Sequence, residues 1–104
     1  MENSQFKIST IQGKLIGLSD IRKIKNAERE LQVSQATFLI ETSNGLKKGV
    51  MFLWDSDAPR IRELTIGSLY EFSAIVKVNI NYMIIFFLPG LTRFRVLVNQ
   101  RKIE

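Results

Sequence analysis

The sequence predicts an all-β protein, a single barrel of five strands with a short helix between the third and the fourth strand. Four segments alternate apolar and polar residues with a period of two, which is typical of strands that bury one face. A fifth, Tyr82–Leu88, is an apolar run that is expected to be a buried strand. Turn-forming residues such as Asn44-Gly45 and Gly67 separate these segments. Because a chain of 104 residues has room for one modest hydrophobic core and not for two, we expect one domain, Met1–Glu104.

The first predicted strand runs from Phe6 to Leu18. Glycines inside a strand usually mark a bulge or a sharp bend, so we expect Gly13 and Gly17 to bend this strand where it serves two parts of the barrel. The next interval, Ser19–Ser34, holds seven charged residues and few large apolar ones. We expect it to be a long loop that is poorly ordered without a ligand.

The second and third strands form the predicted hairpin. Gln35–Thr42 alternates apolar and polar residues and is rich in β-branched and aromatic side chains, as strands are. Asn44-Gly45 then predicts a type I′ turn, because both residues tolerate positive φ. The third strand is expected to be Leu46–Trp54.

A short helix is predicted at Ala58–Leu64. Asp55, Ser56 and Asp57 can cap its N-terminus, and Pro59 suits the first helical turn. We assign Asp55 and Asp57 to capping, since the two carboxylates alone lack the ligand count of a calcium loop.

The second half of the chain supplies the fourth strand, Leu69–Val78, and the fifth, Tyr82–Leu88. Asn79–Asn81 is expected to be the turn between them. Pro89-Gly90 interrupts the last segment, and Leu91–Val98 then predicts a continuation or an added edge strand.

Composition argues against an enzyme. The chain has no cysteine and no histidine, which removes disulfides, the usual zinc sites, and the serine and cysteine triads. We therefore expect no catalytic activity, no cofactor and no metal site.

The remaining composition bears on location and partner. Met1–Gln5 lacks the pattern of a secretory signal, and the longest apolar run, Met83–Leu88, is too short to span a bilayer. We expect an intracellular, cytoplasmic protein that binds no membrane. A net charge of +5 and a pI of about 9.8 favour a polyanionic partner, because cations that neutralise phosphates gain from counterion release.

The order of these elements resembles that of small OB-fold proteins, including single-stranded DNA-binding proteins. The matching segments are Gly13–Ile16, Phe38–Thr42, Lys47-Lys48 before Met51–Trp54, and Ile66–Phe72. The resemblance implies that an oligonucleotide binds the face of the second and third strands, flanked by the loop between strands one and two and the loop between strands four and five. We expect no acidic tail of the kind that the longer family members carry. Another small barrel or a β-sandwich is the alternative fold.

Aromatic residues on the predicted strands are candidates for stacking on bases. Trp54, Tyr70 and Tyr82 are the candidate stacking residues, whereas we expect Phe38 and Phe52 to pack in the core. For Trp54, a place in the core remains the alternative.

Basic residues supply the candidate phosphate contacts. Lys47 and Lys48 follow the hairpin turn and are expected to point to opposite faces. The cations of the expected loop are Arg22, Lys23, Lys25 and Arg29, for which a solvated surface role is the alternative. Arg93 and Arg95 lie two residues apart and are expected to share one face of the last strand.

We therefore expect a non-catalytic protein that binds single-stranded DNA or RNA, with DNA as the first choice. The alternative is an OB-fold subunit that binds protein, either as a homo-oligomer or in a larger complex. Met83–Leu88 and Leu91–Val98 motivate this alternative, because a strand that is apolar on both faces needs a cover.

Overall fold

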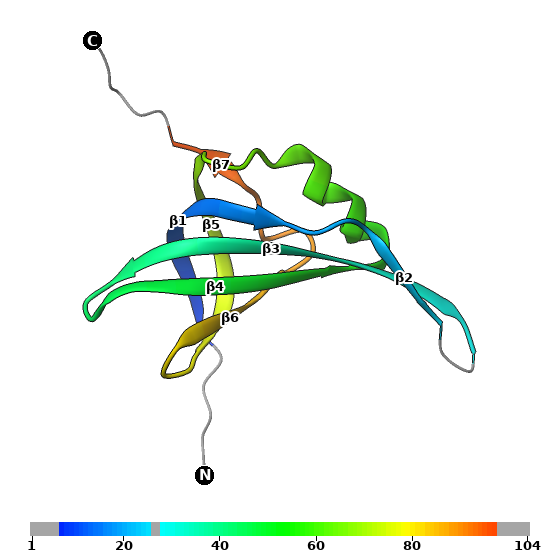
Figure 1. Cartoon of the computed structure of the whole chain (residues 1–104), viewed down its shortest axis with the longest axis horizontal. Coiled ribbons are helices and arrows are strands. Elements are labelled where there is room, and N and C mark those ends of the chain that lie inside the picture. Colours follow the sequence, from blue (N-terminus) through cyan, green and yellow to red (C-terminus); the bar gives the residue numbers. More distant parts are fainter. Residues whose placement is uncertain (1–6, 26–27, 98–104) are drawn as a thin grey trace.

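The structure, a computed structural model, describes residues 7–25 and 28–97. Five strands close a barrel in the order β1-β3-β4-β6-β5, and β5 pairs back to β1 (Figure 1). The contact between β4 and β6 is parallel, and the other contacts are antiparallel. In chain order the elements are β1 (Ile8–Leu18), β2 (Arg22–Lys25), β3 (Glu30–Thr42), β4 (Gly45–Trp54), the 3-10 helix η1 (Asp55–Glu63), β5 (Leu69–Val78), β6 (Tyr82–Phe86) and β7 (Arg95–Val96).

β1 bends where the sequence predicts it. Residues 8–14 pair with β5, residues 13–18 pair with β3, and Gly13 and Lys14 belong to both ladders. The register with β3 shifts between Leu15 and Gly17, so the predicted bulge at this glycine is confirmed. Phe6, which we expected to begin the strand, lies outside the described residues.

The expectation of a long loop at Ser19–Ser34 was wrong. Arg22–Lys25 forms β2, which pairs with the start of β3 from Arg22↔Val33 to Lys25↔Glu30. We call this pair of strands the ribbon; it projects beyond the barrel (Figure 1). The interval has few large apolar residues because a projecting ribbon is solvated on most of its surface, and the strand ladder satisfies its backbone groups.

The ribbon also changes where the helix falls in the strand order. We expected the helix between the third and the fourth strand; η1 instead follows the fourth, between β4 and β5, because β2 adds one strand before it. In the described part of the chain, no helix has the length and apolar character needed to cross a bilayer.

The start of η1 also departs from expectation. The helix begins at Asp55, and the cap position, Trp54, makes no side-chain cap hydrogen bond. Asp55 and Asp57 accept hydrogen bonds from Arg29 and Arg60 instead, at 2.6 and 3.2 Å. The expected capping role of these carboxylates was therefore wrong.

Two turns differ in detail from the prediction. Gly45 has a φ of 102°, but Asn44 is not in the positive-φ region, so the hairpin turn is not type I′.

After β6, the hydroxyl of Thr92 donates to the Ser73 carbonyl at 2.7 Å and accepts from the Leu88 amide at 2.9 Å. The two hydrogen bonds of buried Thr92 hold a turn, so within the described part of the strand expected over Leu91–Val98 only Arg95–Val96 is extended in a sheet. Val98 lies outside the described residues.

The core fills the barrel from all five strands. Phe38 is fully buried, and its ring centroid lies 5.0–6.5 Å from those of Tyr70, Phe72 and Phe94. Packing is close at Gly49 of β4, where an added Cβ would lie 2.6 Å from Ile40 Cδ1 and 2.7 Å from Ile85 Cδ1. A side chain at this position would have to displace buried neighbours.

Candidate nucleic-acid interface

The outer side of β4 and β6 carries large apolar side chains in contact with solvent. Along β4, Gly49, Met51 and Leu53 are buried, while the alternate residues Lys48, Phe52 and Trp54 are exposed. Successive side chains of a strand point to opposite faces, so these two sets lie inside and outside the barrel. The same alternation in β6 places Tyr82 and Phe86 outside.

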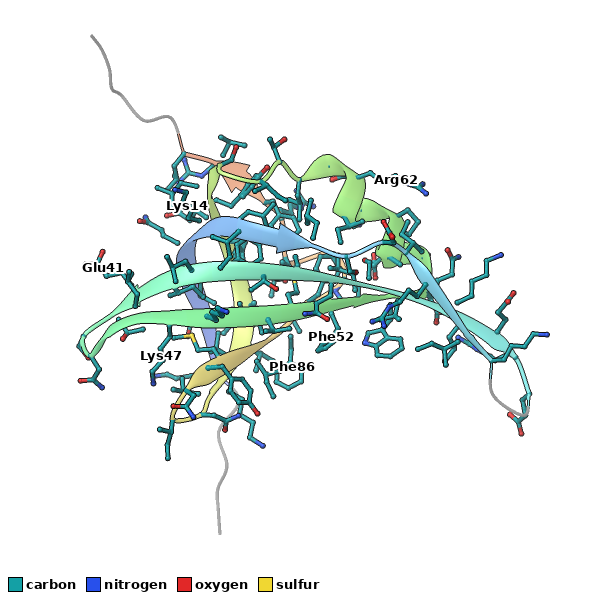
Figure 2. The ribbon with its side chains drawn as sticks, in the orientation of Figure 1. Lys14, Glu41, Lys47, Phe52, Arg62 and Phe86 are labelled. Carbon is teal, nitrogen blue, oxygen red and sulfur yellow. The ribbon has the colours of Figure 1, made fainter. Side chains whose placement is uncertain are left out.

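The register brings the outward side chains of the two strands together. Lys48 pairs with Tyr82, Val50 with Ile84, and Phe52 with Phe86. Phe52 and Phe86 lie beside each other on this side of the barrel (Figure 2). We call the four exposed rings the aromatic wall: their exposed fractions are 38% for Phe52, 48% for Trp54, 43% for Tyr82 and 41% for Phe86.

The ribbon extends this surface. Val33 of β3 pairs with Trp54 on one side and with Arg22 of β2 on the other, and directly paired residues share a face of the sheet. Val33 is 2% exposed although it does not belong to the barrel core cluster. The Val33 side chain therefore lies on the outer side of the sheet, in one row with Arg22 and Trp54, but solvent does not reach it.

A hollow of about 130 Å³ opens in the aromatic wall. Its lining residues are Phe52, Trp54, Ile84, Ile85, Phe86 and Phe87. Among these side chains the indole N–H of Trp54 is the one hydrogen-bonding group. The guanidinium of Arg60, from η1, lies 6.0 Å from the centroid of the Phe87 ring, within the range of a cation–π contact.

Cations lie beside the rings. Lys48 is exposed on the same face as Tyr82, its register partner, and exposed Lys77 of β5 pairs with Ile84 across β5 and β6. Arg22 stands at the ribbon end of the row. Across residues 7–25 and 28–97, none of these three cations forms an ion pair with a carboxylate.

Other predicted phosphate contacts lie elsewhere. Lys47 points toward the end of the barrel, where its Nζ donates to the Asn79 carbonyl at 3.2 Å, so the expected split between Lys47 and Lys48 is confirmed. Lys23 and Lys25 alternate with Arg22 along β2 and therefore point to the other face of the ribbon.

The two C-terminal arginines also lie away from the wall. Arg93 is exposed in the segment before β7. Arg95 forms an ion pair with Glu71, so it is not a free cation. The expected shared face of a longer strand was wrong, because the described strand holds only Arg95 and Val96.

Glu71 lies at the centre of a polar cluster on the outer side of β1 and β5. Its carboxylate accepts hydrogen bonds from Arg95 and, at 3.0 Å, from Gln12 Nε2 of β1. The hydrogen bond from Arg95, with that from Gln12 second, holds the pKa of Glu71 below its ordinary value of 4.5. The charged carboxylate is favoured because both donors stabilise it.

The predicted stacking residues separate into two groups. Trp54 and Tyr82 belong to the aromatic wall, whereas Tyr70 is 2% exposed and its hydroxyl accepts a hydrogen bond from the Thr65 amide at 2.7 Å. A buried ring cannot stack on a base at the surface. Phe38 is in the core as expected, but the same expectation for Phe52 was wrong.

Sequence reasoning missed Phe86, Lys77 and the exposure of Phe52. The alternation in β4 was a usable signal, since Phe52 shares its face with Lys48 and Trp54. Phe86 had no such signal, because it lies in an apolar run on a strand whose two faces look alike in sequence.

Among the residues that the structure describes, no cluster of three acidic side chains could hold a metal ion. The chain matches no protein-family model, no curated protein and no solved structure.

Proposed function

We propose that this barrel is of the OB type and that it binds single-stranded nucleic acid, without catalysis, on the aromatic wall. The strand order supports the fold assignment. With the ribbon strand β2 set aside, β3 and β4 are the second and third barrel strands, η1 follows them, and β6 returns parallel to β4. OB-type barrels bind oligonucleotides on the face of the second and third strands and on the adjoining loops. The aromatic wall shares the third strand, β4, with that face and continues onto the fifth, β6.

The observation that carries the proposal is the alignment, on one wall, of four exposed rings with cations that form no ion pair among the described residues. Exposed rings offer flat faces on which bases stack, and each stacked base contributes about 1–3 kcal/mol. Lys48, Lys77 and Arg22 lie where a phosphate backbone would follow the bases. The two features together fit a single strand better than a duplex, whose bases are already stacked.

The hollow in the wall indicates binding with little base preference. Its lining is aromatic and aliphatic apart from the indole N–H of Trp54. Bases would be held by stacking, which every base can supply, and not by a pattern of hydrogen bonds at their edges. The site is therefore expected to bind oligonucleotides of mixed sequence with similar affinity.

Trp54 is the single tryptophan of the chain and reports directly on the wall. Oligothymidylate should quench its fluorescence, and Trp54→Ala should weaken binding by roughly 1–3 kcal/mol, the contribution of one stacked base. Binding by the variant is followed with a labelled oligothymidylate. Duplex DNA of the same length is the control and should quench less.

The outcome that contradicts the proposal is the absence of quenching together with a large loss of stability in Trp54→Ala. A truncated buried tryptophan costs about 3–5 kcal/mol of unfolding free energy, whereas Trp54 is 48% exposed and should cost less. Urea unfolding of the variant measures this difference.

A protein partner is the second candidate, and Ile80 favours it. This residue is 89% exposed at the turn between β5 and β6, two positions before Tyr82 of the wall. An exposed aliphatic tip beside exposed rings is typical of a protein interface. Failure of every oligonucleotide to bind, with a dimer mass by size exclusion, would favour this candidate.

A further inference from the structure

The barrel is split at one end, where β1 and β3 part. The two strands pair from Gly13↔Ile40 to Leu18↔Ala36. Before Gly13, β1 pairs with β5 alone, and beyond Ile40, β3 pairs with β4 alone. Residues 8–12 of β1 therefore present a strand edge that no described strand covers.

This edge has backbone groups available for pairing. The Leu15 amide donates to the Ser68 carbonyl at 2.9 Å and the Leu15 carbonyl accepts from the Gly67 amide at 2.8 Å, so both groups face the β5 side. Backbone groups alternate between the two edges of a strand. Those of Thr10 and Gln12 therefore face the split.

The edge also lacks the devices that protect exposed strands from pairing. Native edges carry charges, prolines or bulges. Residues 8–12 are Ile, Ser, Thr, Ile and Gln, with no charge and no proline, and their register with β5 is unbroken.

The split opens into a cleft of about 780 Å³. Its floor includes the buried side chains of Ile11, Ile40 and Met83, and its walls include Leu46 and Val78, which are 63% and 58% exposed. A ligand in the cleft could cover the apolar surface that these two side chains expose. The cleft shares no lining residue with the hollow in the aromatic wall.

We propose that this cleft binds an extended peptide of another protein, which adds a strand to the free edge of β1. The occupant is an uncharged segment of about five residues, the length of the edge, with aliphatic side chains at alternate positions. Its backbone pairs with Thr10 and Gln12, and its aliphatic side chains cover Leu46 and Val78. This site is independent of the proposed binding of nucleic acid.

The chemistry of the cleft selects this occupant. Unpaired N–H and C=O groups at strand spacing need a partner with the same spacing, which an extended peptide supplies and a lipid or a small apolar molecule does not. The charged lining residues are Lys14 and Glu41, one of each sign, at the same end of the barrel (Figure 2). Their charges sum to zero, so an uncharged segment fits best.

The test uses the full chain, labelled for NMR, and the acetylated, amidated peptide Thr-Val-Thr-Val-Thr as the probe. Amide hydrogen exchange at Thr10 and Gln12 should slow by about tenfold at saturation, the effect of one added hydrogen bond. Exchange at Ile11 should not change, because its N–H faces β5. The peptide Thr-Val-Pro-Val-Thr, which cannot complete the ladder, should bind more weakly.

Two variants probe the contact. Thr10→Pro removes an N–H that faces the split, a change that strand edges tolerate, and should abolish the response to the peptide. If this variant does not fold, Leu46→Glu provides the test. It places a charge at an exposed position in the side of the cleft and should weaken binding of the peptide by about tenfold. Leu91→Glu, on a residue that is 46% exposed outside the cleft, should leave binding unchanged.

Several results would overturn the proposal. One is unchanged exchange at Thr10 and Gln12 at millimolar peptide. Another is equal binding of the proline peptide, or equal shifts with octanoate, which would make the cleft a site for small apolar molecules. Slowed exchange without peptide that grows with protein concentration would assign the edge to a second copy of this chain.

Discussion

Buried and exposed residues alternate along the strands of both outer walls, that of β4 and β6 and that of β1 and β5. The two walls differ in the partners of their polar and charged groups. On the second wall Gln12 is the register partner of Glu71 and donates to it, and Arg95 joins the pair. On the first wall Phe52 is the register partner of Phe86. On the wall of β1 and β5 the chain's own residues satisfy the carboxylate of Glu71, whereas on the wall of β4 and β6 four rings and the cation Lys48 face solvent.

The difference indicates where a ligand would gain most. Exposed rings regain a favourable environment when a base or another apolar surface covers them. A carboxylate that already accepts two hydrogen bonds gains little from a ligand, and it repels phosphate. A ligand is therefore expected to gain more on the wall of β4 and β6 than on the wall of β1 and β5.

The largest effect is expected from removing the paired rings. The double variant Phe52→Ala, Phe86→Ala should weaken the binding of oligothymidylate by roughly 2–6 kcal/mol if each ring stacks on one base. Fluorescence anisotropy of a labelled oligonucleotide measures the loss. Val96→Ala, on a β7 residue that is 55% exposed and lies outside the aromatic wall, is the control and should bind normally. Equal losses in both proteins would remove the distinction between the walls.

A smaller effect separates two neighbouring lysines. Lys48→Ala should lower the salt slope of binding by about 0.7, the contribution of one phosphate contact to a single strand. Lys47→Ala should leave the slope unchanged, because Lys47 donates to the Asn79 carbonyl at the end of the barrel. Titrations over a series of salt concentrations provide the measurement. A change in Lys47→Ala alone would move the phosphate path to the barrel end.

The smallest effect concerns the polar wall and its pH dependence. Because Arg95 and Gln12 lower the pKa of Glu71 in the folded state, its stabilising contribution is present above the ordinary pKa near 4.5 and is lost as the pH falls through the lowered value. Glu71→Gln should therefore flatten the acid limb of stability, measured as urea midpoints between about pH 6 and pH 3.

The control for this variant is Glu41→Gln, which removes an exposed carboxylate that forms no ion pair with the described residues. It should keep more of the wild-type pH dependence. Neither substitution should change the affinity for oligothymidylate, since Glu71 lies on the other wall. An effect of Glu71→Gln on binding would mean that the two walls are coupled.

Much of the fold followed from local patterns. The strand expected at Leu69–Val78 has those bounds in the structure, because its alternation and the preceding Gly67 are local signals. The ribbon did not follow, because β2 draws its stability from pairing with β3 and has no apolar face of its own. A sequence window that holds only one of the two strands contains no sign of this pairing.

The sequence by itself determined which residues share a face. Period-two alternation places Lys48, Phe52 and Trp54 together along β4, wherever that strand lies. The tertiary structure alone decided that this face is the outer one and that Phe86 lies beside Phe52. That pairing is a parallel contact between strands distant in the chain, and it exists because the barrel closes through β5 and β1. Closure depends on packing across the whole core, which no local pattern records.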